Sequence, residues 1–152
     1  MHSRIFQVSM NPINKGEYIC EGDYYEHWFT REIADYVNDD CNRDWSIDWL
    51  GGDARGYVIG KDDNGEYLII TNKEEYFANA YENFMNELNK IGKPTLKEFV
   101  NGIDLWYLKN ANEDRFGFYI DADGELMTFD AFVRRCIINE KYYIGGVVDY
   151  HF

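Results

Sequence analysis

The sequence predicts an α+β domain with a mostly antiparallel sheet of about five to six strands. Two longer helices are expected to pack on one face of that sheet, together with one or two short helices. Three observations support this fold class. Short β-rich runs recur along the chain, two pairs of these runs flank turns that end in Asn-Gly or Asp-Gly, and two stretches carry apolar residues at helical spacing.

The first strand is expected at Arg4–Ser9, where Phe6 and Val8 share one face and Ile5 lies on the other. The first long helix is expected from about 24 to 38, because apolar residues recur there close to every 3.6 positions. Its predicted stripe comprises Tyr25, Trp28, Phe29, Ile33, Tyr36 and Val37.

The segment 45–49 alternates apolar and polar residues, which is typical of a strand with one buried face. We therefore predict a strand or an extended edge segment that Gly51 and Gly52 end. One face would carry Trp45, Ile47 and Trp49, and the other would carry Asp44, Ser46 and Asp48.

Two β-hairpins are predicted from local turn chemistry. In the first, the runs 57–59 and 66–70 flank a turn that ends in Asn64-Gly65. In the second, the runs 116–120 and 125–127 flank the turn at Asp123-Gly124.

The second long helix should begin after Thr71 or Asn72 and end at Gly92, just before Pro94. Shorter helices are expected from Thr95 to Val100 and from Thr128 or Asp130 to about 137. Residues 142–150 form a last strand, and residues 103–108 fit either a strand or a helix. The apolar stripe of the second long helix comprises Phe77, Ala80, Tyr81, Phe84, Met85, Leu88 and Ile91.

Length and composition indicate a single globular domain over residues 1–152. The chain has 152 residues, 45% of them apolar, only two prolines and no linker-like segment. A chain of this size hides about 68–70% of its unfolded surface on folding, so it needs no disulfide or metal for stability.

The charge balance is strongly acidic. Asp and Glu total 28 against 15 Lys and Arg, which gives a net charge of −13 and disfavours direct contact with nucleic acid or anionic membranes. Solubility explains such a charge, and so does a basic protein partner. Because the chain has neither a signal-like N-terminus nor an apolar run of membrane length, we expect a cytoplasmic protein.

No motif for catalysis, cofactor binding or metal binding is present, so no catalytic residue, metal ligand or cofactor is predicted and a non-enzymatic role is favoured. The three cysteines, Cys20, Cys41 and Cys136, have neither zinc-site nor redox-motif spacing and are expected to be reduced thiols. The Asp-rich hairpin turns lack an acidic first ligand for a calcium loop.

One stretch combines acidity with aromatic residues. Between Asp35 and Glu66, nine acids face three bases, for a local net charge of −6. Such a surface suits an Arg- and Lys-rich partner through electrostatic steering and cation–π contacts. Alternatively, the tryptophans are core residues and the acids form a solvated face. The candidate binding residues are Asp39, Asp40, Asp44, Trp45, Asp48, Trp49, Asp62 and Asp63.

The leading hypothesis is a non-enzymatic interaction protein that binds a basic protein, as inhibitors, immunity proteins and decoys do. A second hypothesis is a small-molecule-binding domain or enzyme with an aromatic-lined pocket, built from Trp28, Trp45, Trp49 or Trp106. A third is a homodimer formed through an aromatic patch.

Overall fold

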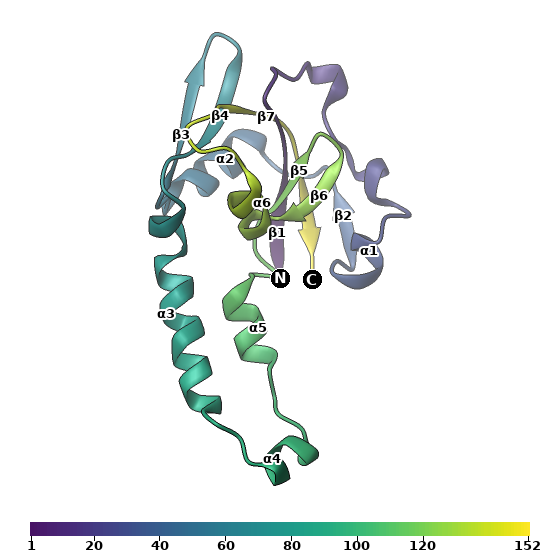
Figure 1. Ribbon diagram of the computed structural model, residues 1–152. Coiled ribbons are helices and arrows are strands. Elements are labelled where there is room, and N and C mark those ends of the chain that lie inside the picture. The colour runs from purple at the N-terminus through teal and green to yellow at the C-terminus, as the bar shows by residue number, and fades with distance from the viewer.

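A computed structural model, which describes all 152 residues, confirms the predicted α+β class. One mixed, mostly antiparallel sheet has the strand order β3-β4-β7-β1-β5-β6, and β2 pairs with β7 off this path (Figure 1). With β2 the sheet has seven strands, slightly more than expected. The strands are β1 (His2–Ser9), β2 (Tyr36–Asn38), β3 (Tyr57–Asp62), β4 (Gly65–Ile70), β5 (Tyr119–Ala122), β6 (Glu125–Thr128) and β7 (Tyr142–His151).

Six α-helices and two 3-10 turns connect these strands. Only α3, with 19 residues, is long, and the next longest helix, α2, has 10 residues. The helices are α1 (Phe29–Glu32), α2 (Arg43–Gly52), α3 (Lys73–Ile91), α4 (Leu96–Asn101), α5 (Trp106–Asn112) and α6 (Phe129–Arg135), and the 3-10 turns are η1 (Lys15–Glu17) and η2 (Glu21–Tyr24).

Strand β7 is the centre of the sheet. It pairs antiparallel with β1 along its length, and on its other edge it pairs with β4 near Tyr143 and with β2 at His151. The pair β1–β5 is the only parallel one. The chain ends lie side by side, as Figure 1 shows, and the N-terminal amino group donates to the Phe152 carbonyl oxygen at 2.6 Å.

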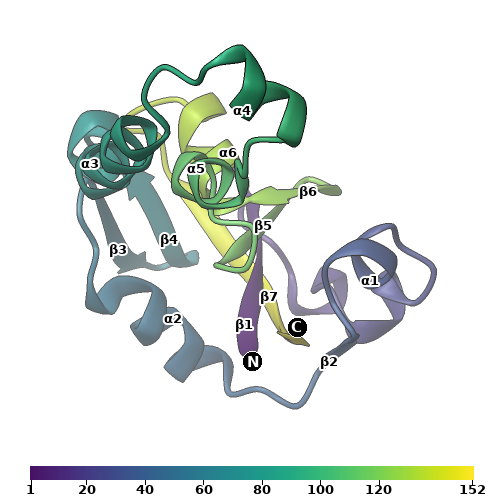
Figure 2. The ribbon, with the colours of Figure 1, turned by 90° about the horizontal axis from the view of Figure 1, so that it is seen from below.

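The two faces of the sheet carry separate hydrophobic clusters. Phe6 and Val8 of β1 point into a larger cluster with residues of α2 and α6, whereas Ile5 points into a smaller one with Tyr24 and Phe29. The predicted alternation of β1 is therefore confirmed. Figure 2 shows α1 and β2 lying apart from the group formed by α3, α5 and α6.

The predicted helix from about 24 to 38 is wrong. The chain instead forms η2, α1 and then β2, whose Tyr36 pairs with His151. The Thr30 hydroxyl donates to the carbonyl oxygens of Tyr24 and His27, both at 2.9 Å, which closes a compact turn there. Pairing with β7 supplies backbone hydrogen bonds that local helical spacing does not anticipate.

The predicted strand at 45–49 is also wrong, because these residues belong to α2. The Asn42 side chain accepts a hydrogen bond from the backbone N–H of Trp45 and caps the helix. Ile47 and Leu50 point into the core, as their helical spacing of three requires. A period-2 pattern of only five residues cannot distinguish the two structures.

Both hairpins, the first and last strands, and the helices α3, α4 and α6 lie close to their predicted positions. The ambiguous segment 103–108 contributes to α5, a helix. Gly65 and Gly124 have positive φ angles of 124° and 89°, which the hairpin turns require. No helix combines the length and the apolar character that crossing a bilayer requires.

Helix α3 has its predicted caps but differs from expectation in packing. Asn72 accepts a hydrogen bond from the N–H of Glu75, and Gly92 ends the helix with φ of 61°. Only the first turns, with Tyr76 and Phe77, pack against the larger core. The rest of α3 projects from the sheet together with α4 and α5 (Figure 1), and we call residues 73–112 the arm and the remaining residues the body.

Candidate functional site

The exposed side of α2 combines two acids with two tryptophans. Asp44 and Asp48 lie one turn apart in one row of the helix, and Trp45 and Trp49 form the neighbouring row. We call these four residues the α2 strip. A strand would have placed the tryptophans and the acids on opposite faces, so the helix brings together what the sequence pattern appeared to separate.

The two tryptophans are half exposed and close to each other. Their exposed fractions are 55% for Trp45 and 41% for Trp49, and their ring centroids are 5.4 Å apart. Trp49 also contacts Phe118 edge-on at 4.9 Å. The alternative that both tryptophans are core residues therefore does not hold.

Arg4 of β1 supports both indole rings. Its guanidinium carbon lies 5.7 Å from the Trp45 ring centroid and 5.5 Å from that of Trp49. A cation at this distance is attracted to the π-face of an aromatic ring. The stacked guanidinium therefore holds the two side chains in place while much of their surface remains open to solvent.

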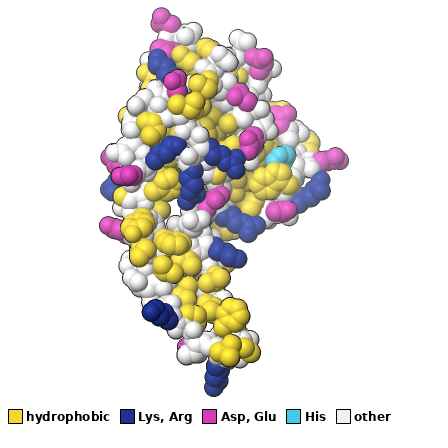
Figure 3. Space-filling view, viewed as in Figure 1, with side chains coloured by type: hydrophobic (Ala, Val, Ile, Leu, Met, Phe, Trp, Pro, Cys, Tyr) yellow, Lys and Arg dark blue, Asp and Glu magenta, His cyan; other side chains and the backbone are white.

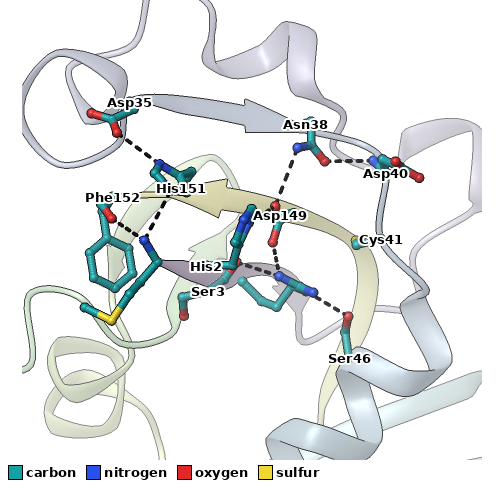
Figure 4. A network of polar contacts seen from close by, with 12 residues as sticks. His2, Ser3, Asp35, Asn38, Asp40, Cys41, Ser46, Asp149, His151 and Phe152 are labelled. Atoms are coloured by element: carbon teal, nitrogen blue, oxygen red, sulfur yellow. Dashed lines mark hydrogen bonds and ion pairs between the residues drawn. The ribbon is translucent and has the colours of Figure 1, made fainter.

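Arg4 is itself fixed by a polar network with Asp149 and Ser46, two residues that Figure 4 labels. It forms an ion pair with Asp149 of β7, and both side chains are nearly buried, with exposed fractions of 11% and 6%. His2 lies 2.8 Å from the same carboxylate and Asn38 3.5 Å from it. No fully buried side-chain nitrogen or oxygen of the protein lacks a hydrogen-bond partner.

The same network reaches α2. The Arg4 Nε donates to the Ser46 Oγ at 3.1 Å, and that hydroxyl donates to the Asn42 carbonyl oxygen at 2.8 Å. Ser46 is fully buried. Strand β1, strand β7 and the first turn of α2 are therefore locked together beneath the α2 strip.

The acids of the strip are largely without ionic partners. The Asp44 side chain is 88% exposed and forms one ion pair, with Arg43 at 3.7 Å. Asp48 makes no ion pair. Just before the helix, Asp39 accepts a hydrogen bond from the Glu21 N–H at 2.7 Å, and Asp40 is exposed. Four of the predicted residues thus form the α2 strip, and two more, Asp39 and Asp40, lie just before the first turn of α2.

The remaining two predicted residues lie at the β3–β4 hairpin instead, Asp62 as the last residue of β3 and Asp63 in the turn. Asp62 accepts hydrogen bonds from Lys141 at 2.8 Å and from Tyr143 at 3.0 Å, and the Lys141 hydrogen bond chiefly lowers the pKa of Asp62. Asp63 is exposed. Asp62 therefore helps to hold the hairpin against β7, and we do not include either residue in the strip.

The cysteines and the possible metal ligands are not arranged for catalysis or for metal binding. Burial raises the pKa of the Cys41 and Cys136 thiols, which keeps them protonated and poorly nucleophilic. Cys20 is exposed, and all three cysteines are unpaired. No group of three or more His, Cys, Asp or Glu side chains is arranged to hold a metal ion.

Sequence reasoning missed a small hollow beside Trp49. It has a volume of about 350 Å³ and aromatic walls that include Trp49 and Phe129. At its polar end, Asp130 accepts hydrogen bonds from the Tyr76 hydroxyl and from the Asp114 N–H, both at 2.7 Å. These residues come from α2, α3, α6 and a loop, and no local spacing in the sequence connects them.

Together these features place exposed carboxylates and half-exposed aromatic rings side by side on one face of α2. Comparison with known proteins finds no match among family models, curated proteins or solved structures.

Proposed function

We propose that the protein is an interaction protein that binds a basic protein partner through the α2 strip. The observation that carries the proposal is the pairing of two exposed acids, Asp44 and Asp48, with two half-exposed tryptophans on one helix face. Partner Arg and Lys side chains would form ion pairs with the carboxylates and stack on the outer faces of the indoles.

Two further properties support this proposal. The net charge of −13 would steer a cationic partner toward the protein and accelerate encounter. The tryptophans are held in place by Arg4, so binding would not have to order them. A surface that served only solubility would require exposed carboxylates but not the exposed tryptophan rings beside them.

The first test is a titration with a nona-arginine peptide, followed by tryptophan fluorescence at about 50 mM and about 500 mM salt. We expect binding at low salt that weakens steeply at high salt. The double substitution Asp44→Asn with Asp48→Asn should weaken binding at least about tenfold, because both facing carboxylates lose their charge.

A matched control removes two charges elsewhere. Glu26 and Glu140 are exposed and make no ion pair, so Glu26→Gln with Glu140→Gln changes the net charge equally. Equal weakening by both double variants, or binding that ignores salt, would show that the strip is not the site. Capture from the native host's lysate with the wild type and the Asp44→Asn, Asp48→Asn variant would then identify the natural partner.

A second candidate function is binding of a small cationic molecule in the hollow beside Trp49. The observation that favours it is the convergence of two carboxylates, Asp114 and Asp130, on an aromatic-walled space of about 350 Å³. Burial raises the pKa of Asp114, which a bound cation would counteract. Calorimetric titration with benzamidine tests this role. Binding that Asp130→Asn abolishes would support it, and absence of heat at millimolar benzamidine would dismiss it.

A further inference from the structure

The arm has an apolar surface that the fold leaves uncovered. No residue from 71 to 118 is buried, although this segment includes the longest helix of the chain. Exposed apolar patches of this extent usually mark a binding surface. The large apolar side chains exposed on the arm are Tyr81, Leu88, Leu96, Phe99, Val100, Leu105, Trp106 and Tyr107.

The tip of the arm presents a compact apolar face. Leu96, Phe99 and Val100 of α4 are exposed at 79%, 69% and 74%. Their spacing of i, i+3 and i+4 places all three on one side of the helix, the pattern by which a helix docks into a groove. A capping box between Thr95 and Glu98 holds this short helix in shape.

A groove of matching character lies where the arm joins the body. Its volume is about 1170 Å³, and its walls come from α1, α3, α5 and α6 with the strands beneath. Trp28, Ile33, Phe84 and Trp106 contribute apolar surface. Its charged lining is balanced, with Glu32, Asp104 and Glu113 against Lys109, Arg115 and Arg135.

Charge is distributed very unevenly between the arm and the body. Residues 73–112 carry six acids and five bases, a net charge of −1, which leaves −12 for the body of a chain with −13 in total. At the tip, Lys90 pairs with Glu87, and Lys93 and Lys97 are opposed only by Glu98. Figure 3 shows apolar side chains running along the arm with lysines at its lower end. The arm is thus the surface on which two copies repel each other least.

We propose that two copies associate through antiparallel arms, with α4 of each copy seated in the groove of the other. Helix α3 is about 28 Å long at 1.5 Å per residue, so this arrangement sets the two acidic bodies at opposite ends of the dimer and reduces their repulsion. It also brings each cationic tip to the other, acidic body. A parallel arrangement would instead set the bodies side by side.

The available area is sufficient for such a dimer. The eight exposed side chains offer on the order of 800 Å² per copy, close to what each partner contributes to a standard stable interface. A membrane would cover only the tip and leave Tyr81, Trp106 and Tyr107 in water. A second copy covers the arm from tip to base, and the contact is self-complementary, as a two-fold interface requires.

Sedimentation velocity of the full chain from about 1 to about 300 µM tests the association. We expect a monomer of 18.0 kDa at low concentration and a species of twice that mass at high concentration. Phe99→Ser should raise the dissociation constant at least about tenfold, because a central aromatic anchor is lost. Phe99 is 69% exposed, so the fold should tolerate the change.

The matched control is Ile137→Ser, which removes an apolar side chain that is 57% exposed on the body. Trp106→Ser in the groove should weaken the dimer as Phe99→Ser does. Mixing these two variants should restore association in part, because one intact tip then meets one intact groove. Rescue in the mixture is specific to docking of a tip into a groove and would not follow from tip-to-tip contact.

A wild-type chain that stays monomeric at every concentration would overturn the proposal, as would a dimer insensitive to Phe99→Ser or a mixture without rescue. If the protein is monomeric, co-sedimentation with vesicles of anionic lipid is the alternative test of the tip. Co-sedimentation that Phe99→Ser abolishes would show that the tip binds membranes instead. The peptide titration at the α2 strip involves neither Phe99 nor Trp106, so the two proposals fail separately.

Discussion

Arg4 and Asp149 are direct cross-strand partners at the centre of the sheet, and their side chains form an ion pair with almost no exposure to water. The same guanidinium lies beneath the rings of Trp45 and Trp49. The ion pair that joins β1 to β7 therefore also positions the α2 strip. A substitution of Arg4 should lower the stability of the fold and loosen Trp45 and Trp49.

We predict that Arg4→Met lowers the free energy of unfolding by about 3 kcal/mol, since it leaves the buried Asp149 carboxylate without its cation. Equilibrium unfolding in urea measures this change, and near-ultraviolet circular dichroism should report loosened tryptophans. In the double variant with Asp149→Asn, the loss should be smaller than the sum of the two single losses. If the two losses of unfolding free energy simply add, the side chains of Arg4 and Asp149 do not stabilise each other.

Local signals in the sequence predicted the hairpins and α3 because turn residues and caps act within a few positions. Asn64-Gly65 and Asp123-Gly124 determine their turns wherever the strands lie. Strand β2 could not be predicted in this way. Its partner, the end of β7, lies more than 100 residues away, and that pairing replaces the helix that Tyr25 and Trp28 indicated.

The candidate site was predicted in composition but not in geometry. The four residues of the α2 strip were all named, yet a strand would have divided them between two faces. In the arm, by contrast, the secondary structure was predicted correctly and the burial was not. The apolar stripe of α3 exists, but it was expected to pack on the sheet and it is not buried. Periodicity identifies an apolar face and does not say whether the same chain covers it.

Glu66 should make stability depend on pH in the acid range. Hydrogen bonds from Lys61 and, after an opposing effect of burial, from Arg43 lower the pKa of Glu66 to about 2. A lowered pKa in the folded state stabilises the protein above the unfolded pKa of about 4.3, and that stability is lost as the pH falls toward 2.

We therefore expect Glu66→Gln to cost about 1 kcal/mol at pH 6, a value reduced by solvent screening of this surface network. The difference from the wild type should shrink steadily below about pH 4.5 and vanish near pH 2. Urea unfolding at several pH values measures it, with Glu140→Gln as an exposed control that should show little difference. A cost for Glu66→Gln that stays constant with pH would exclude the electrostatic origin.

The three thiols should differ sharply in reactivity. Cys20 is exposed, whereas Cys41 donates to the Val147 carbonyl oxygen and Cys136 to that of Val133, both at 3.3 Å. Burial also raises the pKa of the latter two. In the folded protein, Ellman's reagent should modify one thiol rapidly and the other two only after unfolding. Cys20→Ser should remove the rapid phase, and its persistence would place another thiol at the surface.

Salt should act in opposite directions on the two surfaces that we propose to bind. Contact of the α2 strip with a cationic partner rests on opposite charges, so salt should weaken it. Association of two copies through their arms brings together bodies of net −12 each, so screening of their repulsion should strengthen it.

Two measurements on the same sample would separate these effects. Between about 50 mM and about 500 mM salt, the affinity for nona-arginine should fall while the dimer fraction in sedimentation rises. Phe99→Ser should abolish the second trend and leave the first, and Asp44→Asn with Asp48→Asn should do the reverse. A dimer that dissociates in salt would mean that ion pairs, such as those of Lys93 and Lys97 with the other body, hold the two copies together more strongly than the apolar faces of their arms.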